Sequence, residues 1–561
     1  MAAVNLLNRR NCDNFGTNSR FTAIRATLKN ISAGFGLPDL TAFLLLLWYG
    51  MPEERLVPLL ALYFVLKLPL SGRSAVAGAL AFLTICGWTI YEAASGLLQA
   101  AGVKMSNHAA FAITGSFENP GPYGGFIAVG MSVALAYAVR FRRRRKGAYR
   151  VTMMAAALLT LASGFLVLPA SMSRAGWLAL AAAAVLTLSS DRRIRLRLES
   201  AAHKGLFAAA ALILLGGSAA GAFMIKRDSA LGRLHIWRIE CLAIAQRPLS
   251  GSGPGSAMGA YGETQEKFFR SHPDAPTAIV RVAGCPEYAF NEYLGIGMER
   301  GVPGLLLAAA TAISAIVNLQ RRKSSLAGGM LALAVFALFS YPCSIMQFRI
   351  LLVMFLASCG PVRRRGTKAE TLLTAVAALA CTIACIALKP SADALKDAER
   401  EWKRISAYSA YGATQEDVEA LLAVRERLSD NFRYLYDLGY ALHRCGHFEE
   451  SNRVLAEGAE ISSDPMFRVI MGRNFEALGA YARAEEEYLK AHYMVPCRIY
   501  PLLRLMRLQI RTGRDPDAVV TGTEITEMPV NERNAAMLGL QREARQTLDS
   551  LRREAGLCKY E

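Results

Sequence analysis

Charged and polar side chains that could take part in chemistry gather in three short segments next to long apolar runs. Arginines lie in Ser171–Trp177 (SMSRAGW) and Gly232–Arg238 (GRLHIWR), and an asparagine and a carboxylate lie in Tyr288–Leu294 (YAFNEYL). An arginine stays charged at any relevant pH and can bind an anion, or it can simply extend to a membrane interface. A carboxylate in a partly desolvated cleft can gain a pKa suited to a general base, or it can cap a helix. The surrounding elements decide between these roles.

The composition is that of a membrane protein with a soluble appendage. The chain has 561 residues, of which 53% are hydrophobic, and a formal net charge of +19. Its lysines and arginines form short clusters between apolar runs, as the positive-inside rule expects, and no basic stripe with aromatic platforms is present. We therefore expect no nucleic-acid partner. The glycine-rich segment Pro248–Gly255 lacks the GK[ST] of a P-loop, and no CxxC pair or Cys/His metal spacing appears.

Eleven apolar runs have about the length that spans a bilayer as a helix. The first two are short and could instead form a re-entrant pair. The runs lie near 38–51, 56–71, 75–99, 122–140, 151–169, 175–190, 205–225, 301–319, 326–341, 345–360 and 370–388.

The basic clusters predict how these spans are oriented. If the basic N-terminal segment is cytoplasmic, every cluster falls on the cytoplasmic side, as the positive-inside rule requires. The chain then divides into a cytoplasmic tail over 1–36, a transmembrane domain over 37–388 with a large periplasmic loop over 226–300, and a periplasmic domain over 389–561. We expect an inner-membrane location. The clusters are Arg73, Arg140–Lys146, Arg192–Arg197, Arg321–Lys323 and Arg363–Arg365.

The last third of the chain has the periodicity of soluble helices and an internal repeat. Gly439 and Gly446 recur as Gly472 and Gly479, and Gly513 follows at nearly the same interval. The frame resembles tetratricopeptide repeats without their tryptophan, which predicts an α-solenoid with a concave face for a protein partner. A plain helical bundle is the alternative. The fold class expected for the whole chain is all-α.

The order of the motifs resembles the bacterial O-antigen ligase superfamily. Asn119–Gly125 (NPGPYGG) is followed by SRAGW, by an R-x-x-x-W pattern, by PLSGSGPG, and by NEYL with Glu299–Gly304 (E-x-G-x-x-G). The resemblance covers about residues 100–320. The superfamily holds O-antigen ligases, O-antigen polymerases and protein O-oligosaccharyltransferases, and the repeat tail resembles that of Bacteroidetes members.

The resemblance implies a GT-C-like membrane enzyme that transfers a glycan from undecaprenyl diphosphate to an acceptor, without a metal or another cofactor. Arg174 and Arg233 occupy the family positions that bind the diphosphate, whose oxygens match a guanidinium bidentately. Arg238 is a neighbouring candidate for substrate binding. Arg349 is a further one, because an ionisable residue within a membrane span is a functional suspect by default.

One residue departs from the family pattern. The ligases carry a histidine before the Asn or Ser of the last motif, whereas this chain has Phe290 before Asn291. A different base is therefore needed if the acceptor must be activated. Asn291 is expected to cap the following helix, which places Glu292 near a helix N-terminus and makes it a poorer base. We predict Glu287 as the catalytic base, with Asn291 and Glu292 at the substrate.

Several acceptors and two other classes of protein fit the same sequence. Lipid A core is the acceptor we favour, and a protein Ser/Thr or a growing chain are the alternatives. A transporter or flippase would also have many spans, although charged residues do not recur at mid-membrane in paired halves. The loss of the histidine also leaves room for a non-catalytic glycan-assembly protein.

Overall fold

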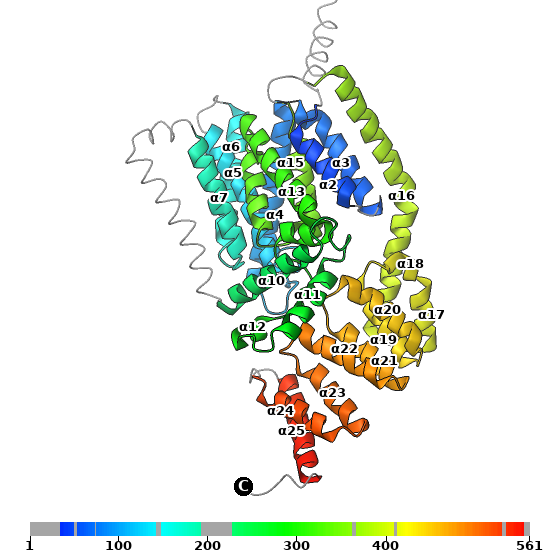
Figure 1. Cartoon of the computed structure of the whole chain (residues 1–561). Coiled ribbons are helices and arrows are strands. Elements are labelled where there is room, and N and C mark those ends of the chain that lie inside the picture. The colour runs from blue at the N-terminus through cyan, green and yellow to red at the C-terminus, as the bar shows by residue number, and fades with distance from the viewer. Residues whose placement is uncertain are drawn as a thin grey trace, which may run out of the picture. The chain divides into compact units, whose positions relative to one another are not determined.

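The computed structural model describes residues 34–49, 53–72, 74–141, 147–191, 227–361, 366–408, 412–529 and 535–554. These residues form helices and connecting turns, without a strand (Figure 1). The all-helical class that we predicted is therefore confirmed for this part of the chain. The expected N-terminal tail, the span near 205–225 and most of the basic clusters lie outside the described residues.

The chain forms two compact units, each built from two separate stretches of sequence. The first, here called the bundle unit, comprises Met1–Ala222 and Leu306–Leu388. The second, here called the loop–tail unit, comprises Phe223–Leu305 and Lys389–Glu561. The long segment between two apolar runs thus folds with the C-terminal third, and not with the helices that flank it in sequence.

The bundle unit is made of apolar helices around a central one. α5 packs against α4, α6, α7 and α14, and its spanning window is 83% buried, compared with 11% for that of α16. The helices of this unit are α2 (Leu37–Tyr49), α3 (Glu53–Ser71), α4 (Ala75–Ala100), α5 (Pro120–Phe141), α6 (Ala148–Val167), α7 (Arg174–Ser190), α14 (Leu326–Ala337), the short η1 (Pro342–Ser344), α15 (Met346–Ala357), and the parts of α13 (Glu292–Arg321) and α16 (Lys368–Tyr408) that fall within it.

The apolar helices make the chain a multi-pass membrane protein. Five helices, α4, α5, α6, α13 and α16, are long and apolar enough to cross a membrane. α2, α7, α14 and α15 are shorter apolar helices. Every predicted run within the described residues corresponds to a helix, but length and composition support spanning for only five of them. The expected count of eleven therefore stays a prediction.

A buried ion pair joins two of the apolar helices. Lys67 of α3 is fully buried, and its Nζ donates to Asp39 Oδ1 of α2 at 2.7 Å and to the Cys359 carbonyl at 2.8 Å. Tyr63 Oη donates to the same carboxylate at 2.6 Å. Because a buried ion pair needs such additional hydrogen bonds to offset its desolvation, this cluster is a satisfied structural one. It joins α2, α3 and the end of α15.

The loop–tail unit combines three helices of the loop segment with the C-terminal helices. α11 packs against α20 and α22 as well as α10. The helices of this unit are α10 (Arg227–Gln246), α11 (Ala257–Ser271), α12 (Thr277–Val282), the remaining parts of α13 and α16, α17 (Gln415–Ala423), α18 (Arg425–Leu428), α19 (Phe432–Arg444), α20 (Phe448–Ile461), α21 (Met466–Ala477), α22 (Tyr481–Met494), α23 (Ile499–Arg511), α24 (Asp515–Glu527) and α25 (Ala535–Glu554).

The predicted glycine spacing marks equivalent turns and helix contacts. Gly446, Gly479 and Gly513 each separate two packed helices and have φ of 85°, 73° and 71°, a conformation that favours glycine. A Cβ on Gly439 would lie 2.6 Å from Leu455, and one on Gly472 would lie 2.5 Å from Tyr488. The repeat is thus one of helix pairs. Its identification as a tetratricopeptide solenoid stays a prediction.

Candidate active site

Arg174 is the first residue of α7, at a point where two helices meet through glycines. Ser173 caps α7, because its Oγ accepts from the Gly176 amide at 3.3 Å and donates to the Gly121 carbonyl at 2.9 Å. A Cβ on Gly176 would lie 2.7 Å from the carbonyl oxygen of Gly124 in α5. The small residues of the NPGPYGG and SMSRAGW motifs therefore hold the starts of α5 and α7 together. Arg174 is half-buried at this junction.

Two polar residues of α4 hold the turn that precedes α5. Gln99 Oε1 accepts from the Thr114 and Gly115 amides at 2.8 and 2.7 Å. The Glu92 carboxylate accepts from the Ser116 amide at 2.9 Å and from its hydroxyl at 2.7 Å. Both side chains are buried, and sequence reasoning missed them. In the sequence, each of them appears only as a polar residue inside an apolar run. Their hydrogen bonds fix the conformation of the turn before α5.

Arg349 lies in the first turn of α15, which packs near the start of α5. Its Nε donates to the Cys343 carbonyl. The neighbouring Phe348 stacks on Phe336 with ring centroids 5.4 Å apart, and a Cβ on Gly125 would collide with the Phe336 ring. The starts of α5, α7 and α15 are therefore linked by packed residues. The bundle unit brings the helix starts of Arg174 and Arg349 to one end.

Phe290, the residue at the family's histidine position, contacts Arg233. The guanidinium carbon of Arg233 lies 5.2 Å from the Phe290 ring centroid. A cation over an aromatic face gains about 0.5–2 kcal/mol, depending on desolvation. The ring cannot take a proton, but it holds the guanidinium of a predicted catalytic residue. Arg238 follows Arg233 by five positions in α10. Its guanidinium carbon lies 4.7 Å from the ring centroid of Phe268 in α11.

Asn291 caps α13, as the sequence predicted. Its Oδ1 accepts from the Tyr293 and Leu294 amides at 3.1 and 3.3 Å. Glu292 is the first residue of the helix, and the local pattern from Asn291 to Leu294 therefore has a structural function. Whether Asn291 and Glu292 also contact substrate stays a prediction.

The two glycine-rich motifs of this region pack on each other. The Ser252 and Gly253 amides donate to the carbonyls of Met298 and Glu299 at 2.8 and 3.1 Å. Gly301 interrupts α13 with φ 67°, and a Cβ there would lie 2.5 Å from the Pro248 carbonyl oxygen. Glycine is therefore required at this close approach. The PLSGSGPG turn and the E-x-G-x-x-G motif form one backbone unit.

Glu287 lies where the loop segment meets the C-terminal helices. Its Oε2 accepts from Arg433 Nη2 of α19 at 2.6 Å, with the Glu287 and Arg433 side chains 46% and 57% exposed. Ser463 Oγ donates to the Pro286 carbonyl at 2.7 Å beside it. The carboxylate is thus ion-paired and half-exposed, and this is not the desolvated environment on which we based its role as a base.

Glu240 is a desolvated carboxylate of this unit that the sequence reasoning missed. It is fully buried on the face of α10 that also buries Ile236, Ile239 and Ala243. Neither of its oxygens has a hydrogen-bond partner among the described residues. Burial raises the pKa of Glu240 to about 8. Its sequence signal is a carboxylate at helical spacing within an apolar stripe.

His235 is committed to the packing of α10 on α11. Its Nε2 hydrogen-bonds Gln265 Oε1 at 3.0 Å, and Tyr261 Oη donates to the same oxygen. Burial lowers the pKa of His235, so the ring is neutral near pH 7. Gln265 in turn donates to the Met494 carbonyl of α22. His235 therefore helps to join α10 and α11 to the C-terminal helices.

The predicted residues fall into two groups, one in each unit. Arg174 and Arg349 belong to the bundle unit, whereas Arg233, Arg238, Glu287, Asn291 and Glu292 belong to the loop–tail unit. Among the residues that the structure describes, no group of three or more His, Cys, Asp or Glu side chains could hold a metal ion.

Comparison with known protein families agrees with the region that holds these motifs. The family model described as O-Antigen ligase matches residues 158–309. The matched region includes Arg174 and the predicted residues of the loop–tail unit, but it ends before Arg349 and the C-terminal helices. No curated protein matches the chain. The match supports the O-antigen ligase superfamily and, in general terms, a glycosyltransferase of the ligase or polymerase type.

Proposed function

We propose that this protein is an inner-membrane glycosyltransferase that moves an oligo- or polysaccharide from undecaprenyl diphosphate to lipid A core in the outer leaflet. The observation that carries the proposal is the family match over 158–309, which contains both arginines expected at the diphosphate. Transfer to a protein Ser/Thr or to a growing chain uses the same donor and is the alternative.

In the proposed reaction, an acceptor hydroxyl attacks the anomeric carbon of the donor sugar. The new glycosidic C–O bond forms as the bond between that carbon and the diphosphate oxygen breaks, and undecaprenyl diphosphate leaves with the electron pair. Arg174 and Arg233 bind the diphosphate oxygens and stabilise the charge that develops there. Arg238 and Arg349 provide further positive charge for the donor.

The hydroxyl proton goes to Glu287 in this scheme. Arg433 Nη2 lies 2.6 Å from Glu287 Oε2 and so fixes the position of the carboxylate. Phe290 contributes by holding Arg233 rather than by proton transfer. Asn291 fixes the start of α13, and Glu292 follows it at the proposed substrate side.

The loop segment and the C-terminal helices lie on the same side of the membrane in this proposal, namely in the periplasm. Contacts between them support this. Ser463 donates to Pro286, Gln265 donates to Met494, and Arg433 pairs with Glu287. Two segments that hydrogen-bond directly to each other within one compact unit must lie on the same side of a bilayer, because the hydrocarbon core would otherwise separate them.

A deletion strain complemented with Arg→Lys variants tests the proposal. We expect Arg174→Lys and Arg233→Lys to reduce glycan transfer strongly at normal protein levels, because lysine keeps the charge but loses the bidentate fork. Arg425→Lys is the matched control, since Arg425 forms an ion pair with Glu457 on α20. Lipopolysaccharide and glycoprotein profiles report the acceptor.

The outcomes separate the classes of function. Loss of glycan on lipid A core, with carrier-linked glycan accumulating in the outer leaflet, supports a ligase. The same accumulation with loss of glycoprotein indicates a protein acceptor, and shortened chains indicate a polymerase. Carrier-linked glycan that stays in the inner leaflet would contradict transfer and point to a flippase. Full transfer by both lysine variants would reject the diphosphate role.

A further inference from the structure

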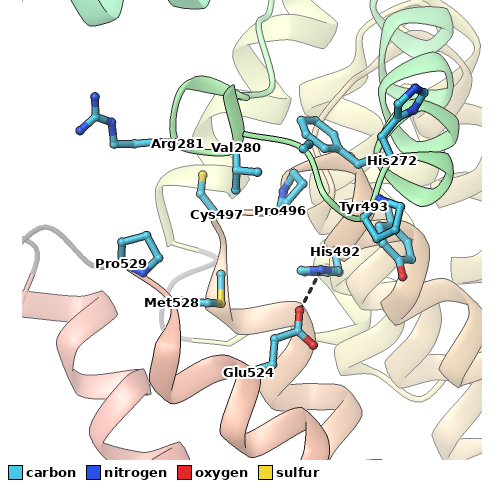
Figure 2. A pocket seen from close by; sticks show the side chains of 13 residues that line it. His272, Val280, Arg281, His492, Tyr493, Pro496, Cys497, Glu524, Met528 and Pro529 are labelled. Atoms are coloured by element: carbon cyan, nitrogen blue, oxygen red, sulfur yellow. Dashed lines mark ion pairs between the residues drawn. The ribbon is translucent and has the colours of Figure 1, made fainter. Parts of the chain in front are cut away.

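The loop–tail unit contains a cavity that none of the motifs explains. Its volume is about 390 Å³, within the range of sites for small ligands. The end of α11, the segment around α12, the end of α22 and the end of α24 surround it (Figure 2). Neither Arg233 nor Asn291 lines the cavity, so the proposed transfer chemistry does not use it.

One polar pair lines an otherwise largely apolar wall. His492 of α22 is 8% exposed, and its Nδ1 has no hydrogen-bond partner among the described residues. Its Nε2 lies 3.5 Å from Glu524 Oε1 of α24 (Figure 2). That distance is too long for a good hydrogen bond. The pair therefore retains hydrogen-bonding capacity that no described side chain uses.

The pair is not an ordinary salt bridge. Burial lowers the pKa of His492 to about 4, so its imidazole is neutral near pH 7. Burial also raises the pKa of Glu524. A neutral imidazole attracts a carboxylate weakly, whereas a hydroxyl group can donate to Glu524 and bond to the histidine nitrogen at once. Buried polar groups normally have such partners.

The rest of the wall favours a ligand with apolar faces between its hydroxyl groups. Phe269, Val280, Met528 and Pro529 provide carbon surface, and the Tyr493 ring lies beside His492. Arg281, which also lines the cavity, is paired with Asp228 at 2.8 Å. An uncharged ligand that has both hydroxyl groups and C–H faces fits this combination better than an anion does.

We propose that this cavity binds a saccharide unit of the glycan, as a subsite that holds the chain away from the reacting bond. The inference rests on the proposed glycosyl transfer for its ligand class, but binding can be measured without transfer. Hydroxyl groups of the sugar bond to His492 and Glu524, and the ring packs against the apolar wall.

The test uses the purified full-length protein in detergent and the polysaccharide that mild acid releases from the host's lipopolysaccharide. Saturation-transfer NMR reports binding. We expect His492→Phe and Glu524→Gln each to weaken binding at least tenfold, because each leaves a ligand hydroxyl without its partner. Val280→Trp, which fills the cavity and leaves both polar groups in place, should have the same effect. His447→Gln is the control, since His447 is exposed and its ring bonds to Gln415, away from the cavity lining.

The results distinguish this inference from the proposed function. Equal binding by the wild type, His492→Phe and Val280→Trp would overturn the saccharide site, even if glycan transfer in cells depends on Arg174 and Arg233. A second outcome combines two results: only the cavity variants lose binding, and deletion of the gene changes no glycan. This outcome would support the saccharide site and reject the proposed transferase function. Thermal unfolding of each variant shows whether a loss of binding reflects loss of structure, and Val280→Trp and Glu524→Gln provide independent routes if His492→Phe fails to fold.

Discussion

Replacement of the buried Glu240 should reveal a pH-dependent destabilisation of the loop–tail unit. Burial raises the pKa of Glu240 from its ordinary value of 4.5 to about 8 in the folded protein. Below about pH 4.5 the carboxyl is protonated in both folded and unfolded chains, and it has no pH-dependent effect. Between that pH and about 8 the unfolded chain loses a proton that the folded chain keeps. Folding stability therefore falls as pH rises through this window.

The size of this effect follows from the two pKa values. Each pKa unit corresponds to about 1.4 kcal/mol, so at pH 7 the carboxyl destabilises the fold by about 3 kcal/mol relative to an isosteric neutral group. For a domain of this size that difference lowers the melting temperature by roughly 6–12 °C. At pH 5 the difference should be below about 1 kcal/mol. Glu240→Gln removes the ionisation and keeps the shape.

Calorimetry of the full-length protein in detergent at pH 5 and pH 8 provides the measurement. We expect Glu240→Gln to match the wild type at pH 5 and to melt at a clearly higher temperature at pH 8. Glu240→Met, whose side chain has no ionisable group, should likewise gain in melting temperature over the wild type between pH 5 and pH 8. Wild type and Glu240→Gln curves that stay parallel between the two pH values would refute the desolvated, protonated carboxyl.

Four further predictions concern the contacts between the loop segment and the C-terminal helices and the side of the membrane on which both lie. Gly259→Ala should make α11 susceptible to proteolysis, because a Cβ there would lie 1.9 Å from a backbone oxygen of α20. Gly284→Ala is the control and should leave the digest unchanged, because a Cβ at that position would have no atom within 4 Å. Glu287→Gln should abolish transfer while lowering stability by only about 1 kcal/mol, because an exposed ion pair contributes little; full activity would remove Glu287 as the base. The double exchange Glu287→Arg with Arg433→Glu should restore the contact but not the activity, and recovered transfer would mean that the pair has only a structural role. A reporter fused after Glu561 should be active only in its periplasmic form, and cytoplasmic activity would overturn the proposed topology.

The parts of the fold that could be predicted from sequence are those specified over short spacings. Gly446, Gly479 and Gly513 recur at a regular interval, and each adopts a positive φ between two packed helices. Asn291 caps α13 through amides two and three residues away. Such features depend on neighbouring residues and on backbone sterics, which a sequence shows directly.

The contacts that sequence reasoning missed join residues far apart in the chain. No local pattern indicates that Gly259 of α11 lies against the backbone of α20, or that Phe290 covers the guanidinium of Arg233. Glu240 was missed for another reason. A single carboxylate in an apolar stripe can lie at a helix edge in solvent or be fully buried, and only the packing of α10 on α11 decides between the two.

These long-range contacts give the C-terminal helices a positioning role in the proposed transfer that does not depend on the acceptor. Ser463 bonds to Pro286, Arg433 pairs with Glu287, and both contacts fix the segment just before Phe290. Phe290 in turn holds the guanidinium of Arg233, a residue of the proposed diphosphate site. A displacement of α19 or of the α20–α21 turn would therefore reach Arg233 through two contacts and the short chain segment that ends at Phe290. Because this positioning would serve a lipid, a protein or a growing chain equally, the presence of the C-terminal helices does not by itself favour a protein acceptor.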